Sequence, residues 1–489
     1  MKRIAIIGSG FSSLAAAIDI SSKGYHVDLF EKNNTIGGRA RQLKSDGFTF
    51  DMGPSWYWMA DVFDDFFEKH QKKTSDYFEL EKLDPGFSVV FGNNDRISVS
   101  SSFDELKSTF ESIEKGSAAK LDKFMKNAKI KYDIGMKDLV KKPSHNIFEF
   151  INFKVVKGLF YLNIFSSFSS YVRRYFKNSK LIQLMEFPVL FLGATPENTP
   201  ALYSLMNYTG MVDGTYYPKG GFYSVIQGFE KLALENGVNF HLNSNVEKIN
   251  IEGSKVKSII VNSETIEYDA VIAGADYHHV ETKLLDKKYR NYSDKYWDSR
   301  KLAPSSLLFY LGINKKLTNI DHHTLFFDQD FKIHAKEIYE NPKWPSNPLF
   351  YLSCSSISDD TVAPKGMESL VFLIPIAPGI EDSDDIRKKY LSIILNRFKE
   401  LTGNDIEQNI IFNKSYCLND FVNDYNALKG NAYGLANTLK QTAILKPKLR
   451  NKKVKNLFYT GQLTVPGPGV PPSIISGEIV ANELNHYFN

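Results

Sequence analysis

The sequence predicts an α/β fold, in which a mixed α+β module is inserted into a Rossmann-type doubly wound sheet. At the start of the chain, the apolar run Ile4–Ile7 leads into Gly8-Ser-Gly10. Near the end, residues 456–480 repeat the order of strand, glycine turn and helix. Between them, short strands at 239–261 precede the apolar run 270–276, as in a meander that leaves a sheet and returns to it. A chain of 489 residues has room for two or three such modules.

The opening unit, residues 3–31, is typical of a dinucleotide site. Gly8 turns the chain sharply after a buried parallel strand, and Gly10 leaves room for a pyrophosphate at the N-terminus of the next helix. Ser13 stands where the G-x-G-x-x-G pattern has its third glycine, and it is small enough for close helix–strand packing. Glu31 follows about 20 residues later, at the end of a second strand, where its carboxylate can accept the hydrogen bonds of a ribose diol. A glycine turn in an ordinary α/β unit is the alternative.

Three later turns have the same character. Gly37-Gly38-Arg39 places backbone amides and a cation where they can meet a diphosphate. The Pro218-Lys-Gly-Gly221 turn feeds a helix expected over Tyr223–Glu235. Near the end of the chain, a Gly461 turn and a glycine-proline loop lead to a helix starting near Pro471, whose N-terminus can stabilise negative charge on a reduced flavin ring.

The composition is that of a globular protein, with 43% apolar and 24% charged residues. Aromatic residues make up 13%, which suits either a site for a large apolar ligand or dense packing. The two cysteines provide neither a disulfide framework nor a C-x-x-C metal motif, and the adjacent His322 and His323 are expected to point in different directions, so we expect no metal. The first strand begins at residue 3, and no long uncharged apolar run follows, so we expect a cytoplasmic chain.

Residues 120–180 form a strongly basic region. They carry twelve lysines and two arginines against four acidic residues, a balance of +10, whereas the whole chain is +4. The apolar and aromatic stretch 155–172 lies inside this region and is typical of a segment in the headgroup layer of an anionic membrane. The alternative is a solvated basic face over a buried helix. Nucleic acid is not expected as a partner, because no nucleic-acid module accompanies the charge.

The opening fingerprint, Gly37-Gly38-Arg39, Phe50-Asp-Met-Gly-Pro54, the Pro-Lys-Gly-Gly turn and the closing Gly-Pro-Gly-Val-Pro-Pro loop together resemble the bacterial-type phytoene desaturases. These carotenoid desaturases belong to the FAD amine oxidase-like flavoproteins, and the resemblance spans essentially the full chain. It implies a GR2-like FAD-binding domain (1–66, 216–285 and 430–489), a substrate-binding domain (67–104 and 286–429) and a helical, basic, membrane-associating lid (105–215). Gln462 departs from the pattern, since many relatives in the wider group have an acidic residue there.

The resemblance implies FAD as the cofactor. The residues expected to bind it are Gly8, Gly10, Phe11, Ser12, Ser13, Glu31, Lys32, Gly38, Arg39, Gly53, Pro54, Ser55, Val246, Gly461, Gln462, Gly469 and Val470. Flavin N5 is expected to carry the chemistry, and no side chain is assigned as a catalytic base. Arg173, Arg174 and His145 are expected near the substrate entry, in solvated or headgroup-facing roles.

The implied function is desaturation of a long isoprenoid polyene, by hydride transfer to flavin N5 and loss of a proton. Phytoene to lycopene is the first expectation, and a carotenoid 3,4-desaturase acting on hydroxylated carotenoids is the runner-up. A redox-neutral carotenoid isomerase, an amine oxidase and a prenyl-binding escort protein of the same fold are further alternatives. The expected partners are a carotenoid, the inner face of the cell membrane as a peripheral contact, and oxygen or a quinone as electron acceptor.

Overall fold

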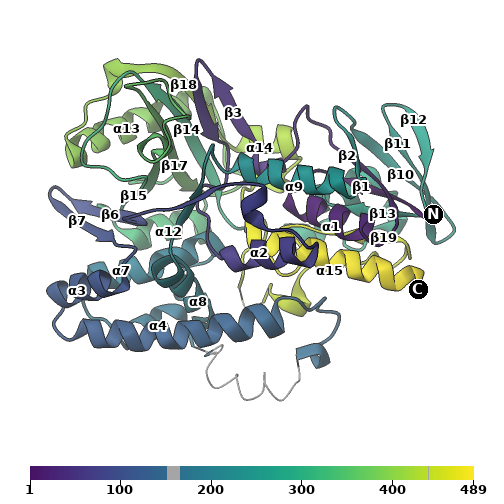
Figure 1. The fold of residues 1–489 in the computed structure, drawn as a ribbon, viewed down its shortest axis with the longest axis horizontal. Helices are drawn as coiled ribbons and strands as arrows, with labels where there is room; N and C mark the ends of the chain where they lie inside the picture. The colour runs from purple at the N-terminus through teal and green to yellow at the C-terminus, as the bar shows by residue number, and fades with distance from the viewer. Residues whose placement is uncertain (151–162, 164–165, 439) are drawn as a thin grey trace.

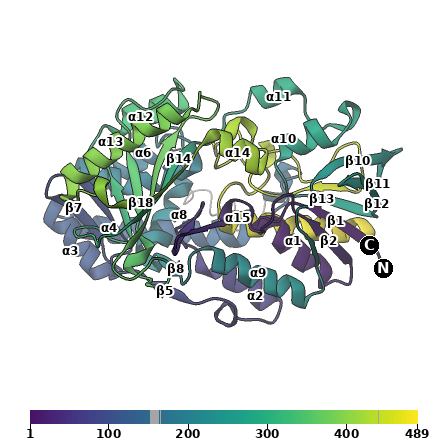
Figure 2. The same cartoon turned by 90° about the horizontal axis from the view of Figure 1, so that it is seen from above.

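The computed structural model describes residues 1–150, 163, 166–438 and 440–489. Figure 1 shows three parts: a parallel sheet beside both chain termini, a second, larger sheet, and a helical part that runs below them. The view from above separates the two sheets, with helices α14 and α15 between them (Figure 2). The boundaries of the three predicted domains stay predictions.

The first sheet is parallel throughout and has five strands. In spatial order they are β19 (Leu457–Tyr459), β13 (Ala270–Ala273), β1 (Arg3–Ile7), β2 (His26–Phe30) and β9 (Asn239–His241). Side chains of β1 alternate between two cores: Ile4 and Ile6 pack among helices, whereas Ala5 and Ile7 pack against the meander. The predicted doubly wound sheet is therefore confirmed, with both faces buried.

Helices and a meander cover the two faces of this sheet. The helices are α1 (Phe11–Ser21), α2 (Ala60–Lys69), α9 (Tyr223–Glu235) and α15 (Val470–Phe488). The meander on the other face consists of β10 (Val246–Glu252), β11 (Lys255–Val261) and β12 (Glu264–Glu267). Figure 1 shows α15, from the end of the chain, lying beside α1, from its start. The two termini therefore contribute to one module.

The second sheet has seven strands. Their spatial order is β18 (Ile410–Tyr416), β14 (Ser305–Ile313), β17 (Glu368–Ile376), β16 (Phe350–Ser353), β15 (His323–Phe326), β6 (Phe87–Gly92) and β7 (Asp95–Val99). Helices α12 (Phe331–Tyr339) and α13 (Asp384–Thr402) lie over this sheet, and Leu307 and Phe309 of β14 pack in one core with α13. The alternate residues Leu308 and Tyr310 face the opposite way, towards the aromatic core that the sheet shares with the helical part.

Smaller elements connect these parts. The paired strands are β3 (Gln42–Ser45) with β4 (Phe48–Asp51), and β5 (Leu80–Lys82) with β8 (Tyr216–Pro218). The short helices are α10 (Tyr277–His279), α11 (Asp294–Asp298) and α14 (Leu418–Tyr425). The helical part contains α3 (Phe103–Ile113), α4 (Ser117–Ile134), α6 (Phe168–Val172), α7 (Ser179–Glu186) and α8 (Leu205–Tyr208).

The described residues of the basic region include helices α4 and α6 and the start of α7, but their charges are not all on a solvated face. Lys131 is fully buried on α4, where its Nζ donates to the carbonyl of Ala201 and to Ser204 Oγ, both at 3.0 Å. Burial lowers the pKa of Lys131 to about 7. Arg173 forms an ion pair with Glu186. Most of the predicted headgroup segment 155–172 lies outside the described residues, and no helix in the described part of the chain is long and apolar enough to cross a bilayer.

The two adjacent histidines correct another expectation. The side chains of His322 and His323 were expected to point in different directions, but their ring centroids lie only 4.4 Å apart. His322 sits in a bend immediately before β15, so the alternation of side chains along a strand does not yet apply to it. The described residues contain no cluster of His, Cys, Asp and Glu side chains suited to a metal ion.

Candidate active site

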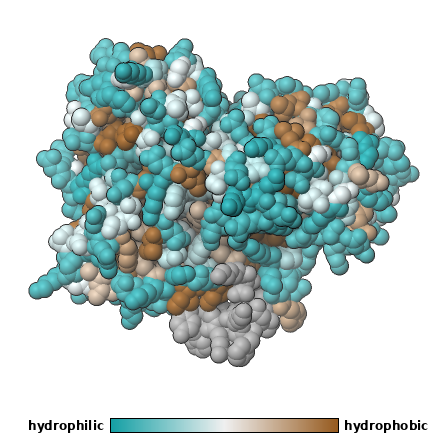
Figure 3. Space-filling view, viewed as in Figure 1, coloured by the Kyte–Doolittle hydropathy of each residue, from teal (hydrophilic) through white to brown (hydrophobic). Residues whose placement is uncertain are grey.

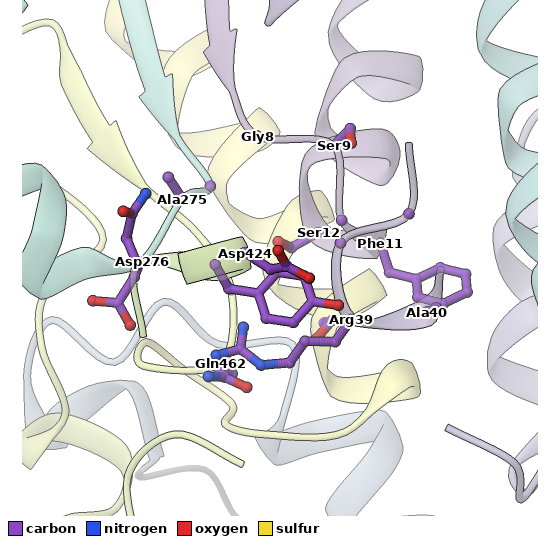
Figure 4. A pocket seen from close by; sticks show the side chains of 18 of the residues that line it. Gly8, Ser9, Phe11, Ser12, Arg39, Ala40, Ala275, Asp276, Asp424 and Gln462 are labelled. Atoms are coloured by element: carbon purple, nitrogen blue, oxygen red, sulfur yellow. The ribbon is translucent and has the colours of Figure 1, made fainter. Parts of the chain in front are cut away.

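A cavity of about 290 Å³ lies at the carboxyl edge of the five-stranded sheet. Residues that directly follow four of its strands line it, namely Gly8 after β1, Glu31 after β2, Gly274 after β13 and Thr460 after β19. The N-termini of α1 and α15 also open onto this space, which Figure 4 shows from close by. Parallel α/β sheets bind nucleotides at this edge, because helix N-termini and flexible turns meet there.

All of the predicted FAD-binding residues line this cavity except Ser13 and Ser55. Ser13 is fully buried beneath it, and a Cβ on Gly274 would meet Ser13 Oγ at 1.9 Å. Ser13 thus brings α1 close to β13, the packing role expected of the third fingerprint position. Ser55 lies next to the cavity, in a smaller one, and its Oγ is 3.0 Å from the hydroxyl of Tyr351. The individual contacts of these residues with FAD stay predictions.

Two glycines leave a backbone cradle in the wall of the cavity. Gly8 has a φ of +93°, and a Cβ there would lie 3.1 Å from the backbone nitrogen of Ala275. Gly38 has a φ of +55°, and a Cβ there would lie 3.3 Å from the Cα of Gly10. A side chain at either position would strain the backbone and fill space between two turns. These turns can therefore bring backbone close to a diphosphate.

Four hydrogen bonds hold the carboxylate of Glu31, which is expected to bind a ribose, in the wall of the cavity. One carboxylate oxygen accepts from the backbone nitrogen of Ser9 at 3.1 Å and from Ser9 Oγ at 2.6 Å. The other accepts from the backbone nitrogen and from Nδ2 of Asn33, both at 2.9 Å. These four donors occupy the lone-pair sites of the carboxylate. A ribose diol can therefore bind Glu31 only if the Ser9 hydroxyl or the Asn33 amide turns away.

Arg39 provides the charge that fits a diphosphate. Its buried Nε has no partner among the described residues, while Nη2 donates to the carbonyl of Asn431 at 3.2 Å. Figure 4 shows Arg39 beside Gln462, whose amide oxygen accepts from Nη2 at 3.1 Å when it is turned towards it. Burial lowers the pKa of Arg39, while the nearby Asp276 raises it. An unpaired guanidinium N–H beside a glycine cradle fits the pyrophosphate of FAD.

The cavity also has wall residues that the sequence did not reveal as site residues. Asp276 follows β13 by only a few residues, so its position at the sheet edge could have been predicted from the strand at 270–273. Burial raises the pKa of Asp276 to about 6, and its Oδ2 has no partner among the described residues. Asp424 and Tyr425 enter from α14, far away in the chain. No local pattern marks them, because tertiary packing alone brings α14 to the cavity.

Asp51 is expected to make the stability of the folded protein depend on pH. It accepts a hydrogen bond from the backbone nitrogen of Phe222 at 2.7 Å, and burial raises its pKa from 3.8 to about 7. The folded state therefore holds a proton that the unfolded chain has lost between these two pH values, and stability falls as the pH rises through this window.

We expect the melting temperature to fall less between pH 5 and pH 8 in Asp51→Asn than in the unsubstituted protein, because the amide cannot ionise and can still accept from Phe222. Thermal unfolding across this range measures the difference. Asp298→Asn, at an exposed aspartate on α11, is the charge-matched control and should leave the original slope in place. An unchanged slope in Asp51→Asn would contradict the assignment.

Comparison with known proteins agrees with this geometry. The profile of the flavin containing amine oxidoreductase family matches residues 11–485. The chain belongs to this family. Membership confirms the expected flavoprotein fold, FAD as the cofactor and an oxidoreductase as the class of enzyme.

Curated relatives of this flavin oxidoreductase are carotenoid desaturases. It is 38% identical to the carotenoid 3,4-desaturase of Haloarcula japonica, with 98% of this chain and 97% of that protein covered. It is 32% identical to the 4,4'-diapophytoene desaturase of Staphylococcus haemolyticus, with 98% of each covered. It is 30% identical to the zeta-carotene-forming phytoene desaturase of Myxococcus xanthus, with 99% of this chain and 94% of that protein covered. The resemblance to carotenoid desaturases is thus confirmed.

Solved structures share the fold at lower identity. An oxidoreductase from Methanosarcina mazei aligns with a TM-score of 0.65 at 15% identity, covering 98% of this chain and all of that one. Putrescine oxidase bound to putrescine aligns with a TM-score of 0.62 at 12% identity, covering 99% of each chain. The Rab GDI of Plasmodium falciparum aligns with a TM-score of 0.55 at 14% identity, covering 100% of this chain and 97% of that one. Enzymes and an escort protein thus share this fold, and fold alone does not choose between them.

Proposed function

We propose that this flavin oxidoreductase desaturates a carotenoid, and that its reaction is a 3,4-desaturation of an already conjugated acyclic carotenoid. Full-length identity of 38% to a carotenoid 3,4-desaturase, joined to an intact FAD cradle, carries this proposal. Identity to the two phytoene-type desaturases is 30% and 32%. Desaturation of phytoene to lycopene is the second candidate, and the similarity to a phytoene desaturase supports phytoene as its substrate.

The walls of the cavity suit this chemistry. A new double bond requires two adjacent carbons to lose a hydride and a proton, and bound FAD supplies the acceptor for the hydride. Met52, Leu308 and Leu373 line the cavity on the side of the seven-stranded sheet. Such apolar side chains can exclude water and hold a carbon pair in place. We assign no catalytic base.

Pigment analysis tests the proposed reaction. The chain is expressed in one host that accumulates phytoene and in another that accumulates lycopene. We expect the lycopene host to form a more conjugated product that has lost two hydrogen atoms per new double bond. A coloured product in the phytoene host would favour the second candidate. An isomer of unchanged mass would indicate the isomerase, and no change in either host would contradict carotenoid desaturation.

We also propose that the helical part docks on an anionic membrane, from which a carotenoid can enter. A surface groove between α4 and α6 is lined by Lys120, Lys123 and Arg174 together with two tyrosines. Phe148 is 75% exposed on the same part of the molecule. Figure 3 shows apolar surface at the lower edge, near the C-terminal end of α4. Cations beside exposed apolar groups suit a headgroup layer.

Charge reversal in this groove should weaken vesicle binding. We expect Lys123→Glu with Arg174→Glu to lower the affinity for phosphatidylglycerol vesicles by about tenfold or more, since each basic residue near such a surface contributes about 1 kcal/mol. Co-sedimentation measures the bound fraction. Lys388→Glu with Lys389→Glu makes the same charge change on exposed residues of α13 and should leave binding unchanged. Equal loss in both variants would indicate a response to net charge rather than to the groove. Lys154 and Lys157 of the basic region lie outside the described residues.

A further inference from the structure

Desaturation removes a proton as well as a hydride, and the apolar wall described above offers no group to take this proton. A small cavity of about 20 Å³ adjoins the FAD cavity, and the two share Gly53, Leu308 and Leu373. The wall of the small cavity carries polar side chains, among them Ser55, Tyr217, His322 and Tyr351. A hydrocarbon makes no hydrogen bonds, so these polar groups point to a role other than packing against the carotenoid.

Three side chains form a hydrogen-bonded chain that starts beside the FAD cavity. Gly53 and Pro54 line that cavity, and Ser55 follows them directly. Ser55 Oγ lies 3.0 Å from the hydroxyl of Tyr351, which in turn lies 2.6 Å from His323 Nδ1. Both are hydrogen-bond distances between groups that can donate and accept. When Ser55 donates to Tyr351 and Tyr351 donates to His323, each proton has an acceptor ahead of it.

His323 can hold a proton at the far end of this chain. The residue is fully buried, and its Nε2 has no partner in the described part of the molecule. Burial, together with the neighbouring His322, lowers the pKa of His323 well below its usual value, so the ring is neutral at physiological pH and Nδ1 can accept. The carbon cation that hydride loss leaves behind is a much stronger acid than an imidazolium. A weakly basic ring is therefore sufficient as the acceptor.

The rings around His323 suit a positive charge that forms for a short time. The indole of Trp56 stacks on the imidazole, with ring centroids 4.3 Å apart and planes 10° apart. The face of an aromatic ring attracts a cation. The ring of His322 lies 4.4 Å from that of His323, and His322 Nδ1 lies 2.9 Å from the hydroxyl of the half-buried Ser358. His322 is therefore the next group that can take the proton towards solvent.

We propose that Ser55, Tyr351 and His323 remove the proton that the carotenoid loses. This inference rests on the proposed function and adds the proton acceptor to it. Once the hydride is lost, the neighbouring C–H bond breaks and its electron pair forms the new double bond. The proton passes to Ser55 Oγ, the hydroxyl proton of Ser55 passes to Tyr351, and that of Tyr351 passes to His323 Nδ1. The imidazolium of His323 then carries the positive charge that has left the carotenoid.

Substitutions along the chain test this path in the purified FAD enzyme, with lycopene as substrate, or with phytoene if only the phytoene host forms a product. We expect Tyr351→Phe and Ser55→Ala to lower kcat by about a hundredfold, because each removes the path to a positioned proton acceptor. Ser55→Thr keeps the hydroxyl group and should retain most of the rate. Ser355→Ala makes the same change in the wall of the small cavity, outside the chain, and should keep the original kcat.

Three further measurements separate a chemical role from structural support. Quenching of flavin fluorescence should show the same affinity for the carotenoid in Tyr351→Phe as in the unsubstituted enzyme. Deuterium on the carbon that loses the proton should slow Tyr351→Phe more than the unsubstituted enzyme, because proton loss has become the slow step. Nitrogen NMR of histidine-labelled protein, without carotenoid, should show a shifted His323 Nδ1 resonance in Tyr351→Phe and an unchanged one in Ser355→Ala. The original kcat in both Tyr351→Phe and Ser55→Ala would overturn the proposal.

Asp51 also lines the small cavity and is the rival proton acceptor. Its carboxylate accepts from the backbone nitrogens of Phe222 at 2.7 Å and Tyr223 at 3.4 Å, and these bonds hold it at the start of α9. If Asp51→Asn lowers kcat and increases the isotope effect whereas Tyr351→Phe does neither, the proton goes to Asp51 and the proposal is wrong.

The unsubstituted enzyme separates this inference from the proposed function. If it desaturates neither carotenoid, the proposed function fails, and the proton path fails with it. If it desaturates one of them and the Ser55 and Tyr351 variants are equally fast, the proposed function stands and only the path fails. If desaturation occurs and both variants lose kcat with the affinity unchanged, both stand.

Discussion

Replacing Arg39 with methionine is expected to lower the affinity for FAD by about tenfold to a hundredfold. Hydrogen bonds to a charged group contribute about 1.5–3 kcal/mol, and Arg39 lines the cavity with a buried Nε that has no partner among the described residues. The same substitution removes a half-buried cation whose pKa burial already lowers. The melting temperature of the apoprotein should therefore stay the same or rise, while the increase on adding FAD becomes smaller. Fluorescence titration and thermal unfolding measure the two effects.

Arg41 provides a matched control for this prediction. Both guanidinium groups lie over the ring of Tyr425, at 5.1 Å for Arg39 and 5.2 Å for Arg41. Arg41 forms an ion pair with Asp424 and is not part of the cavity wall. Arg41→Met should therefore destabilise the protein and leave the affinity of the folded protein for FAD nearly unchanged. Equal loss of FAD in the two variants would mean that the Tyr425 region acts only as structural support.

The parts of the fold that were predictable are those with local causes. The strand at 3–7, the helix at 223–235 and the strand at 270–273 follow from apolar runs bounded by glycine turns. Glu31 was placed correctly at the end of β2, because parallel strands deliver their following residues to one edge. The sequence alone therefore sufficed to bring these residues to one cavity, which we expect to bind FAD.

Features that depend on distant segments were not predictable. In the sequence, Lys131 resembles the other lysines of the basic region, which are expected on the surface. In the structure, its side chain is buried against residues 201–204. The small cavity next to the FAD cavity combines Ser55 and Tyr217 with side chains of the seven-stranded sheet, and no periodicity links their positions. Neither secondary-structure propensity nor a local sequence motif predicts such contacts, because they form only when the two sheets face each other. Identifying these contacts therefore required the three-dimensional arrangement.

Gly477 lies on α15 where this helix packs against α1, and replacing it with alanine should strongly destabilise the protein. Helix propensity alone predicts the opposite, since alanine is favoured over glycine by about 1 kcal/mol inside a helix. Steric clashes outweigh this gain in helix propensity, because a Cβ on Gly477 would lie 2.3 Å from the carbonyl oxygen of Ser12 and 2.8 Å from the Cβ of Ala15. Both atoms belong to α1, which is packed between β1 and α15 and has little room to move.

Overpacking of this kind is unfavourable by about 1–3 kcal/mol and outweighs the gain in propensity, so we expect a lower melting temperature for Gly477→Ala. Since the N-termini of α1 and α15 both line the cavity, separating the helices should also weaken FAD binding. Gly92→Ala is the control, because its Cβ would meet no atom within 4 Å. A Gly477→Ala protein as stable as the original would show that α1 and α15 can move apart freely. In that case the close approach of the two chain ends would not be what holds the FAD cradle together.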